Sequence, residues 1–157
     1  MYFDPRQIKH LSESVDNDLI KFLLNSAKEA KSSQATVGKI VDEQYIAVHN
    51  PDICNANFVD YTNFADNVDQ IVRQCKEIVE HQYSVECMTH SIDFLHYPDG
   101  AHYWPHVDGQ YVDGAFVRRS NINRDITCVV YLNDDYQGGE AYFPFFDIER
   151  SRSPETY

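Results

Sequence analysis

The chain has 157 residues, a formal net charge of −12 at pH 7, and 43% hydrophobic and 13% aromatic residues. This length allows one domain with a hydrophobic core and excludes two independent ones. The negative charge would repel a phosphate backbone, which argues against a nucleic-acid partner and favours a protein or peptide. No apolar run is long enough to cross a membrane, and the N-terminus lacks the pattern of a signal peptide, so we predict a cytoplasmic protein without a membrane partner.

The first part of the chain, residues 1–84, is predicted to be mainly helical. An apolar stripe at helical spacing predicts a helix over residues 16–31, with Asp16 as its N-cap. A longer stripe predicts a second helix over residues 63–81. Between the helices, the sequence predicts two short strands and a loop, at residues 40–41, 45–48 and 50–52.

From residue 85 the pattern becomes extended. Residues 86–97 alternate loosely and end at a turn signal, Pro98-Asp99-Gly100. The run Asp125–Leu132 is rich in β-branched residues and predicts a central strand. A Gly-containing loop and two further strands are expected after it, at residues 133–139, 140–146 and 147–152. Helices followed by strands predict an α+β domain over residues 1–157, in which helices pack on a β core.

The four cysteines are Cys54, Cys75, Cys87 and Cys128. They form no CxxC pair, which excludes paired zinc knuckles. In the absence of an export signal we expect reduced thiols. Two of them, Cys87 and Cys128, fall in predicted strands and can be neighbours, although buried packing is the favoured role.

The residues with the clearest chemistry lie in Tyr97–Asp108, YPDGAHYWPHVD. If the end of this stretch is extended, His106 and Asp108 point to the same side, one strand step apart. Two histidines and one carboxylate, with open positions left over, form the facial triad of mononuclear Fe(II) oxygenases. An isolated H-x-D is common by chance, but here it follows a turn and is flanked by aromatic residues that can shield a cavity.

The third ligand is not evident. His106 is the last of the seven histidines in the chain, so no histidine follows the H-x-D pair. On a straight strand His102 would lie about 13 Å from His106, too far to share one ion. Either His90 or His96, on the preceding extended segment, could approach from the side, but nothing in the sequence requires it.

Two blocks of sequence resemble a known family. Residues 97–100, YPDG, and 106–108, HVD, are similar to the Y-x-x-G…H-x-D segment of the prolyl 4-hydroxylase-like Fe(II)/2-oxoglutarate dioxygenases. Residues 124–133, RDITCVVYLN, and 138–144, GGEAYFP, resemble the R-x-(L/I)-T…YLN…GGE(T/L)xFP block of the same family. The blocks occur in the family order, and the resemblance covers roughly residues 85–150.

The resemblance implies a double-stranded β-helix (jelly-roll) core, with residues 85–157 as its N-terminal part and residues 1–84 as helical support. It implies that His106 and Asp108 bind Fe(II), and that Tyr97 hydrogen-bonds the distal carboxylate of the co-substrate 2-oxoglutarate. The implied activity is hydroxylation of a C–H bond, with peptidyl proline as one candidate target, and release of succinate and CO2. Ascorbate is an optional accessory. Ala141 departs from the family, since many members have a threonine there that contacts the same carboxylate.

The family places its third ligand, and a basic residue that pairs with 2-oxoglutarate, well downstream of the GGE block. This chain stops thirteen residues after Pro144, and Arg150 and Arg152 lie too early to match that basic residue. We therefore expect a jelly roll that is incomplete at its C-terminus, a second chain that completes the β core, and no turnover by this chain alone. One alternative is an inactive truncated or degenerate family member that acts as a binding or assembly module. Another is a cupin-like metal site that uses the histidines between residues 90 and 106.

Overall fold

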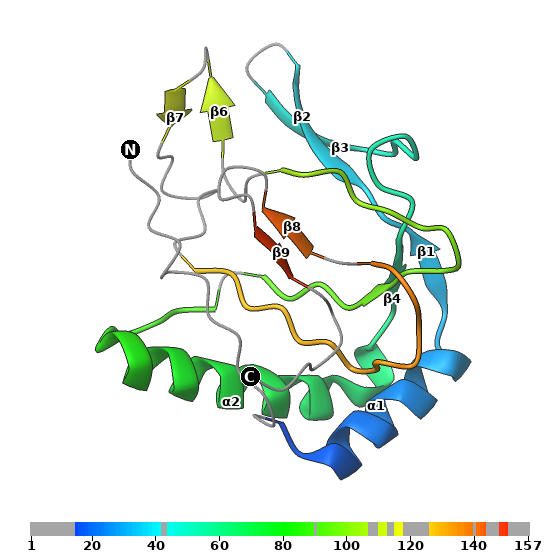
Figure 1. Cartoon of the computed structure of the whole chain (residues 1–157), viewed down its shortest axis with the longest axis vertical. Helices are drawn as coiled ribbons and strands as arrows, with labels where there is room; N and C mark the ends of the chain where they lie inside the picture. Colours follow the sequence, from blue (N-terminus) through cyan, green and yellow to red (C-terminus); the bar gives the residue numbers. More distant parts are fainter. Residues whose placement is uncertain are drawn as a thin grey trace.

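The computed structural model describes residues 15–41, 44–89, 91–106, 110–112, 115–117, 126–139, 141–143 and 148–150 (Figure 1). The elements in chain order are α1 (Asn17–Glu29), β1 (Ser32–Gln34), β2 (Val37–Val41), β3 (Gln44–Val48), β4 (Asn57–Val59), the 3-10 turn η2 (Thr62–Phe64), α2 (Ala65–Tyr83), β5 (Leu95–His96), β6 (Gln110–Val112), β7 (Ala115–Val117), β8 (Ala141–Phe143) and β9 (Ile148–Arg150). Two helices with short antiparallel strands confirm the predicted α+β class.

Helix α1 begins where the sequence predicts. The side chain of Asp16 accepts hydrogen bonds from the backbone N–H groups of Asp18 and Leu19, at 2.8 and 3.0 Å. These bonds satisfy two of the donors that every helix start leaves without an intrahelical partner. One face of the helix carries Leu19 and Leu23 into the core, where Leu23 is only 1% exposed.

Helix α2 is the longer helix and lies along one end of the molecule (Figure 1). Its buried residues Val68, Ile71 and Val79 repeat at helical spacing, as the apolar stripe predicts. The helix ends at Ser84, whose φ of 52° is left-handed, a conformation that commonly terminates helices. The carboxylate of Glu80 then accepts the backbone N–H of Cys87 at 2.7 Å, which ties the helix end to the following segment.

The strands form small antiparallel sheets. A three-stranded sheet has the order β1-β4-β5, and three separate hairpins pair β2 with β3, β6 with β7, and β8 with β9. The short strands predicted around residues 40–48 and 140–152 are confirmed in type. The described strands are not joined into one larger sheet, so the jelly roll remains a prediction.

Two strand predictions are wrong for the residues that the structure describes. Residues 126–132 lie in no strand, and the strand expected over residues 86–97 is reduced to β5. In the first case Val130 and Leu132 pack against the helix-bearing core, while Val129 is 65% exposed. This alternation suits an extended chain, but a strand also requires a neighbour that completes its hydrogen-bond ladder.

The buried side chains form two clusters. The first joins the helices to the central strand β4 and contains Leu19, Leu23, Val59, Phe64, Val68 and Ile71. The second cluster is smaller and contains Ala35, Val37, Cys54 and Ala56. Leu95 of β5, Tyr97 and Tyr103 pack against it. No helix within the described residues is both long enough and apolar enough to span a membrane.

Candidate functional site

The segment that precedes His106 is held against a distant loop. The backbone N–H of Trp104 donates to the Ile53 carbonyl at 2.9 Å, and Cys54 and Tyr103 form an isolated antiparallel bridge. The backbone N–H of His102 donates to Asn55 Oδ1 at 2.6 Å, and the Asn55 N–H donates to the His102 carbonyl at 3.2 Å. This ladder fixes the path of the chain directly before the H-x-D pair.

A turn interrupts the pairing of these two segments. Cys54 pairs with Tyr103, and Asn57 pairs with His96. The first segment advances by three residues from one pair to the other, whereas the second advances by seven. The extra residues are taken up by the turn at residues 98–101, which is closed by the Ala101 N–H to the Pro98 carbonyl at 2.9 Å. Gly100 has a φ of 76°, which the third position of a type II turn requires. The turn signal in the sequence is therefore confirmed.

Tyr97 directly follows β5 and precedes the turn at residues 98–101. It is partly buried and packs, together with Tyr103, against the small cluster that contains Cys54 and Ala56. This position agrees with a structural role for the ring. The predicted contact of Tyr97 with 2-oxoglutarate remains a prediction.

His106 is exposed, but its ring is oriented by two contacts. The Nδ1 atom lies 2.9 Å from the Trp104 carbonyl oxygen, and the imidazole stacks on the ring of Tyr103 with centroids 3.9 Å apart and planes 20° apart. Because a carbonyl oxygen can only accept, Nδ1 carries the proton and the lone pair of the neutral ring falls on Nε2. Histidines that bind metals are commonly oriented in this way.

The other predicted ligands are not gathered around His106. Asp108 and His90 lie outside the described residues. The ring of His102 is turned toward the loop, where Nε2 lies 3.2 Å from the Asp52 carbonyl oxygen. Among the described residues, no three His, Cys, Asp or Glu side chains are close enough together to hold a metal ion.

A shallow hollow of about 330 Å³ lies beside His106 and is lined by His102, Tyr103, Trp104 and Pro105. Trp104 is 62% exposed there, and Ile53, to which its backbone is bonded, is 39% exposed. An aromatic and aliphatic surface is thus presented to solvent on a backbone that hydrogen bonds hold in place. The sequence offered one signal for it, a tryptophan and a proline between two histidines.

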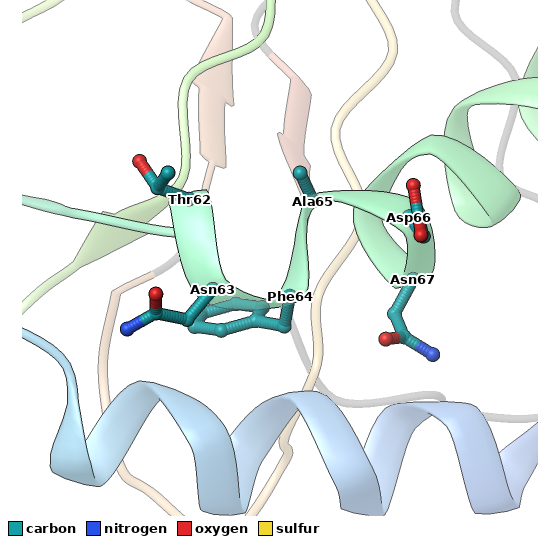
Figure 2. A pocket seen from close by; sticks show the side chains of 6 residues that line it. All are labelled: Thr62, Asn63, Phe64, Ala65, Asp66 and Asn67. Atoms are coloured by element: carbon teal, nitrogen blue, oxygen red, sulfur yellow. The ribbon is translucent and has the colours of Figure 1, made fainter.

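A second hollow, of about 140 Å³, lies at the start of α2 (Figure 2). Four of its six lining residues are polar, Thr62, Asn63, Asp66 and Asn67, and the ring of Phe64 lies on the side of α1. Nearby, Asp60 accepts the Thr62 hydroxyl at 2.6 Å and the Thr62 N–H at 3.1 Å, and these bonds lower the pKa of Asp60. We assign these hydrogen bonds a structural role at the start of α2.

The second sequence block is described only in part. Glu140 and Pro144 lie outside the described residues, whereas Ala141 begins β8 and is paired in register with Arg150 of β9. Asn133, in the preceding loop, donates from Nδ2 to Asp135 at 2.6 Å, which lowers the pKa of Asp135. Within the described part of the block, residues 133–139 lie in no strand and residues 141–143 form β8, whereas the central strand predicted before them is absent from residues 126–132.

The four cysteines are free thiols. Burial raises the pKa of Cys75, and the neighbouring Cys128 thiol raises it further. Burial also raises the pKa of Cys128, with a smaller contribution from Cys87. The sequence-based suggestion that Cys87 and Cys128 are neighbours agrees with this electrostatic interaction. A raised pKa disfavours the reactive thiolate. Buried packing describes Cys54, whereas Cys128 is exposed and Cys87 is only partly buried.

Comparison with known proteins identifies no relative: no family model, no curated protein and no solved structure matches this chain.

Proposed function

We propose that this chain carries part of an Fe(II)/2-oxoglutarate dioxygenase site of the prolyl 4-hydroxylase-like type, within a jelly-roll core. His106 and Asp108 are the proposed metal ligands, and Tyr97 is the proposed contact to 2-oxoglutarate. When bound, the iron would activate O2 for hydroxylation of a C–H bond as 2-oxoglutarate is converted to succinate and CO2. The chain's own residues would hold the metal, orient the co-substrate and shield the site.

The observation that carries this proposal is the orientation of the His106 ring. Its Nδ1–H donates to the Trp104 carbonyl at 2.9 Å, so the neutral ring presents Nε2 as its lone-pair donor. Imidazole and carboxylate are suitable ligands for Fe(II), and the H-x-D spacing supplies one of each. The stacked ring of Tyr103 restricts rotation of the imidazole, which reduces the entropy lost when a metal binds.

One further position supports the co-substrate half of the proposal. Tyr97 directly precedes the turn at residues 98–101 and packs on the same buried cluster as Tyr103, whose ring stacks on the imidazole of His106.

The described residues supply part of the metal site. His106 fits a metal ligand, but no group of three metal-binding side chains is assembled within the part of the chain that is described. No histidine follows His106 in these 157 residues. We therefore expect two protein ligands from this chain and weak metal binding.

The test is anaerobic calorimetric titration of the chain with Fe(II). His106→Ala and Asp108→Ala should each weaken binding by about tenfold or more, because each removes one of two ligands. His81→Ala is the matched control, since His81 is an exposed histidine on α2. An Asp108→Ala variant with unchanged Fe(II) affinity would sink the H-x-D assignment.

Turnover is measured separately. With Fe(II), ascorbate and 2-oxoglutarate, we expect this chain alone to release no succinate above a control without protein, because no group of three metal-binding side chains is assembled among the described residues. Succinate release that disappears in His106→Ala would show instead that the third ligand lies within these 157 residues.

A second candidate function is a non-catalytic binding module. The observation in its favour is the exposed surface at Trp104, next to a histidine that lacks an assembled ligand set among the described residues. The Fe(II) titration distinguishes the two candidates, because binding that depends on both His106 and Asp108 is expected only if these residues form part of a metal site.

A further inference from the structure

Trp104 is an exposed residue on a backbone that hydrogen bonds hold in place. The residue is 62% exposed, while its backbone N–H donates to the Ile53 carbonyl at 2.9 Å and its carbonyl accepts from His106 Nδ1 at 2.9 Å. A large aromatic surface in water is costly unless a ligand covers it, and tryptophan is enriched among the residues that dominate binding energies. A backbone held at both ends also lowers the entropy cost of binding.

The charges of the chain are segregated around this tryptophan. Residues 40–72 and 77–117 contain thirteen Asp and Glu residues and no Lys or Arg. Both segments of the ladder, residues 53–55 and 102–104, lie within these two acidic stretches. The two segments that form the ladder therefore contribute no lysine or arginine of their own to the surface at Trp104.

Acidic residues also stand next to the ladder in the sequence. Asp52 directly precedes Ile53, and its carbonyl accepts the ring N–H of His102. Asp99 is exposed in the turn at residues 98–101, which leads into the same ladder. We call the exposed residues Ile53, Trp104 and Pro105, together with Asp52 and Asp99 on the segments that lead into the ladder, the Trp104 face.

We propose that the Trp104 face binds a peptide segment bearing arginine or lysine, with the cationic group over the indole. The indole offers the strongest side-chain cation–π partner, and arginine can also stack on it through its planar guanidinium group. Ile53 and Pro105 provide apolar surface for the aliphatic stem of the same side chain, and the two carboxylates attract its charge. If the bound peptide is the substrate of hydroxylation, this proposal rests on the proposed function. Binding of a cationic peptide to the Trp104 face does not itself require the metal.

Charge argues against the other occupants. A nucleic acid would be repelled by the acidic stretches. A second copy of this chain also carries a net charge of −12, so self-association through this face would bring like charges together. An acidic peptide meets the same repulsion, whereas a cationic peptide is attracted before it makes contact.

The experiment uses the full chain, without metal or 2-oxoglutarate, at low ionic strength. A short fluorescein-labelled peptide in which arginine alternates with glycine is titrated by fluorescence anisotropy. A second peptide carries citrulline, the uncharged isostere, in place of every arginine. In parallel, the unlabelled peptides are followed by intrinsic emission, since Trp104 is the single tryptophan and reports directly on this face.

We expect the arginine peptide to bind, to shift or quench the Trp104 emission, and to lose affinity with added salt. Trp104→Ala should weaken binding at least about tenfold, and Trp104→Phe should retain part of it because a ring face remains. Asp52→Asn and Asp99→Asn should each weaken binding roughly two- to fivefold. Asp69→Asn, an exposed carboxylate on α2, is the control that removes the same charge elsewhere.

Several results would overturn the proposal. Equal affinity for the arginine and citrulline peptides would show that binding does not depend on the cationic group. Unchanged affinity in Trp104→Ala would show that the peptide binds elsewhere on the protein. Concentration-dependent dimerisation that Trp104→Ala abolishes would show that a second copy is the occupant. Because no metal is present, the failure of Fe(II) binding leaves this test unaffected, and the failure of peptide binding leaves the metal titration unaffected.

Discussion

The side chain of Asn55 is predicted to hold the candidate site together, and Asn55→Ala tests this directly. Its Oδ1 accepts the His102 N–H at 2.6 Å across a sequence separation of 47 residues. A net intramolecular hydrogen bond contributes about 0.5–1.5 kcal/mol, and an N–H that becomes buried without a partner costs more. His102 is exposed, so water can replace the lost acceptor and the larger penalty does not apply. We expect a loss of about 1 kcal/mol, or about 2–4 °C in Tm.

The assay is urea unfolding followed by circular dichroism, with Asn55→Asp as the matched variant. Asp retains an oxygen acceptor at the same position, so it should retain most of the stability that Ala loses. Asn63→Ala, at an exposed asparagine in η2, controls for the general effect of removing a surface amide. A local readout is also available, since acrylamide quenching of the single tryptophan reports whether residues 102–104 have loosened.

Two results would refute this reasoning. If Asn55→Ala and Asn55→Asp unfold at the same urea concentration, the Oδ1 acceptor does not stabilise the fold. If Asn55→Ala is destabilised but quenching of Trp104 is unchanged, the bond stabilises the protein without holding the ladder.

The remaining predictions concern the core and pH. Leu23→Ala, at a side chain that is 1% exposed between the helices, should lower the free energy of unfolding by about 3–5 kcal/mol in urea titrations, and an effect below about 1 kcal/mol would contradict the core assignment. Cys75 should make stability fall with rising pH, because its raised pKa means that the unfolded thiol ionises first. Its contribution is complete below the unfolded pKa of the thiol and is lost as the pH rises through the folded pKa, so unfolding of Cys75→Ala should depend less on pH than that of the wild type across this alkaline range.

The sequence predicts the helices well because their signals are local. The apolar stripe of α2 repeats over the whole helix, and Asp16 caps α1 through bonds to residues only two and three positions away. Such patterns are complete within one turn or a few turns of chain.

The strand predictions fail where a distant partner decides the outcome. The β-branched run that ends at Leu132 indicates extended chain, but a sequence window does not contain the neighbour that would make it a strand. The β6–β7 hairpin was missed even though it had a local signal. Asp113-Gly114 stands between Val112 and Ala115, which pair in register, and Asp-Gly is a preferred two-residue hairpin loop.

The candidate site lies between these two cases. Its residue types were readable, since Tyr97, His106 and Asp108 stand in one short stretch. The orientation of the His106 ring could not be predicted, because it depends on the carbonyl of Trp104. The backbone N–H of Trp104 is in turn bonded to the carbonyl of Ile53, which is about fifty residues earlier in the chain. No pattern in either segment alone indicates that they pair.

The same chain of hydrogen bonds links the proposed metal ligand to the proposed peptide-binding surface. The Trp104 carbonyl is turned to the imidazole of His106 while its N–H is turned to Ile53, so both polar backbone groups are used within the protein. The indole is then the only part of this residue that remains to face a ligand, and it does so directly beside the proposed iron ligand. A peptide bound there would be presented to the metal by the residue that also orients His106, which is the arrangement that hydroxylation of a peptide requires.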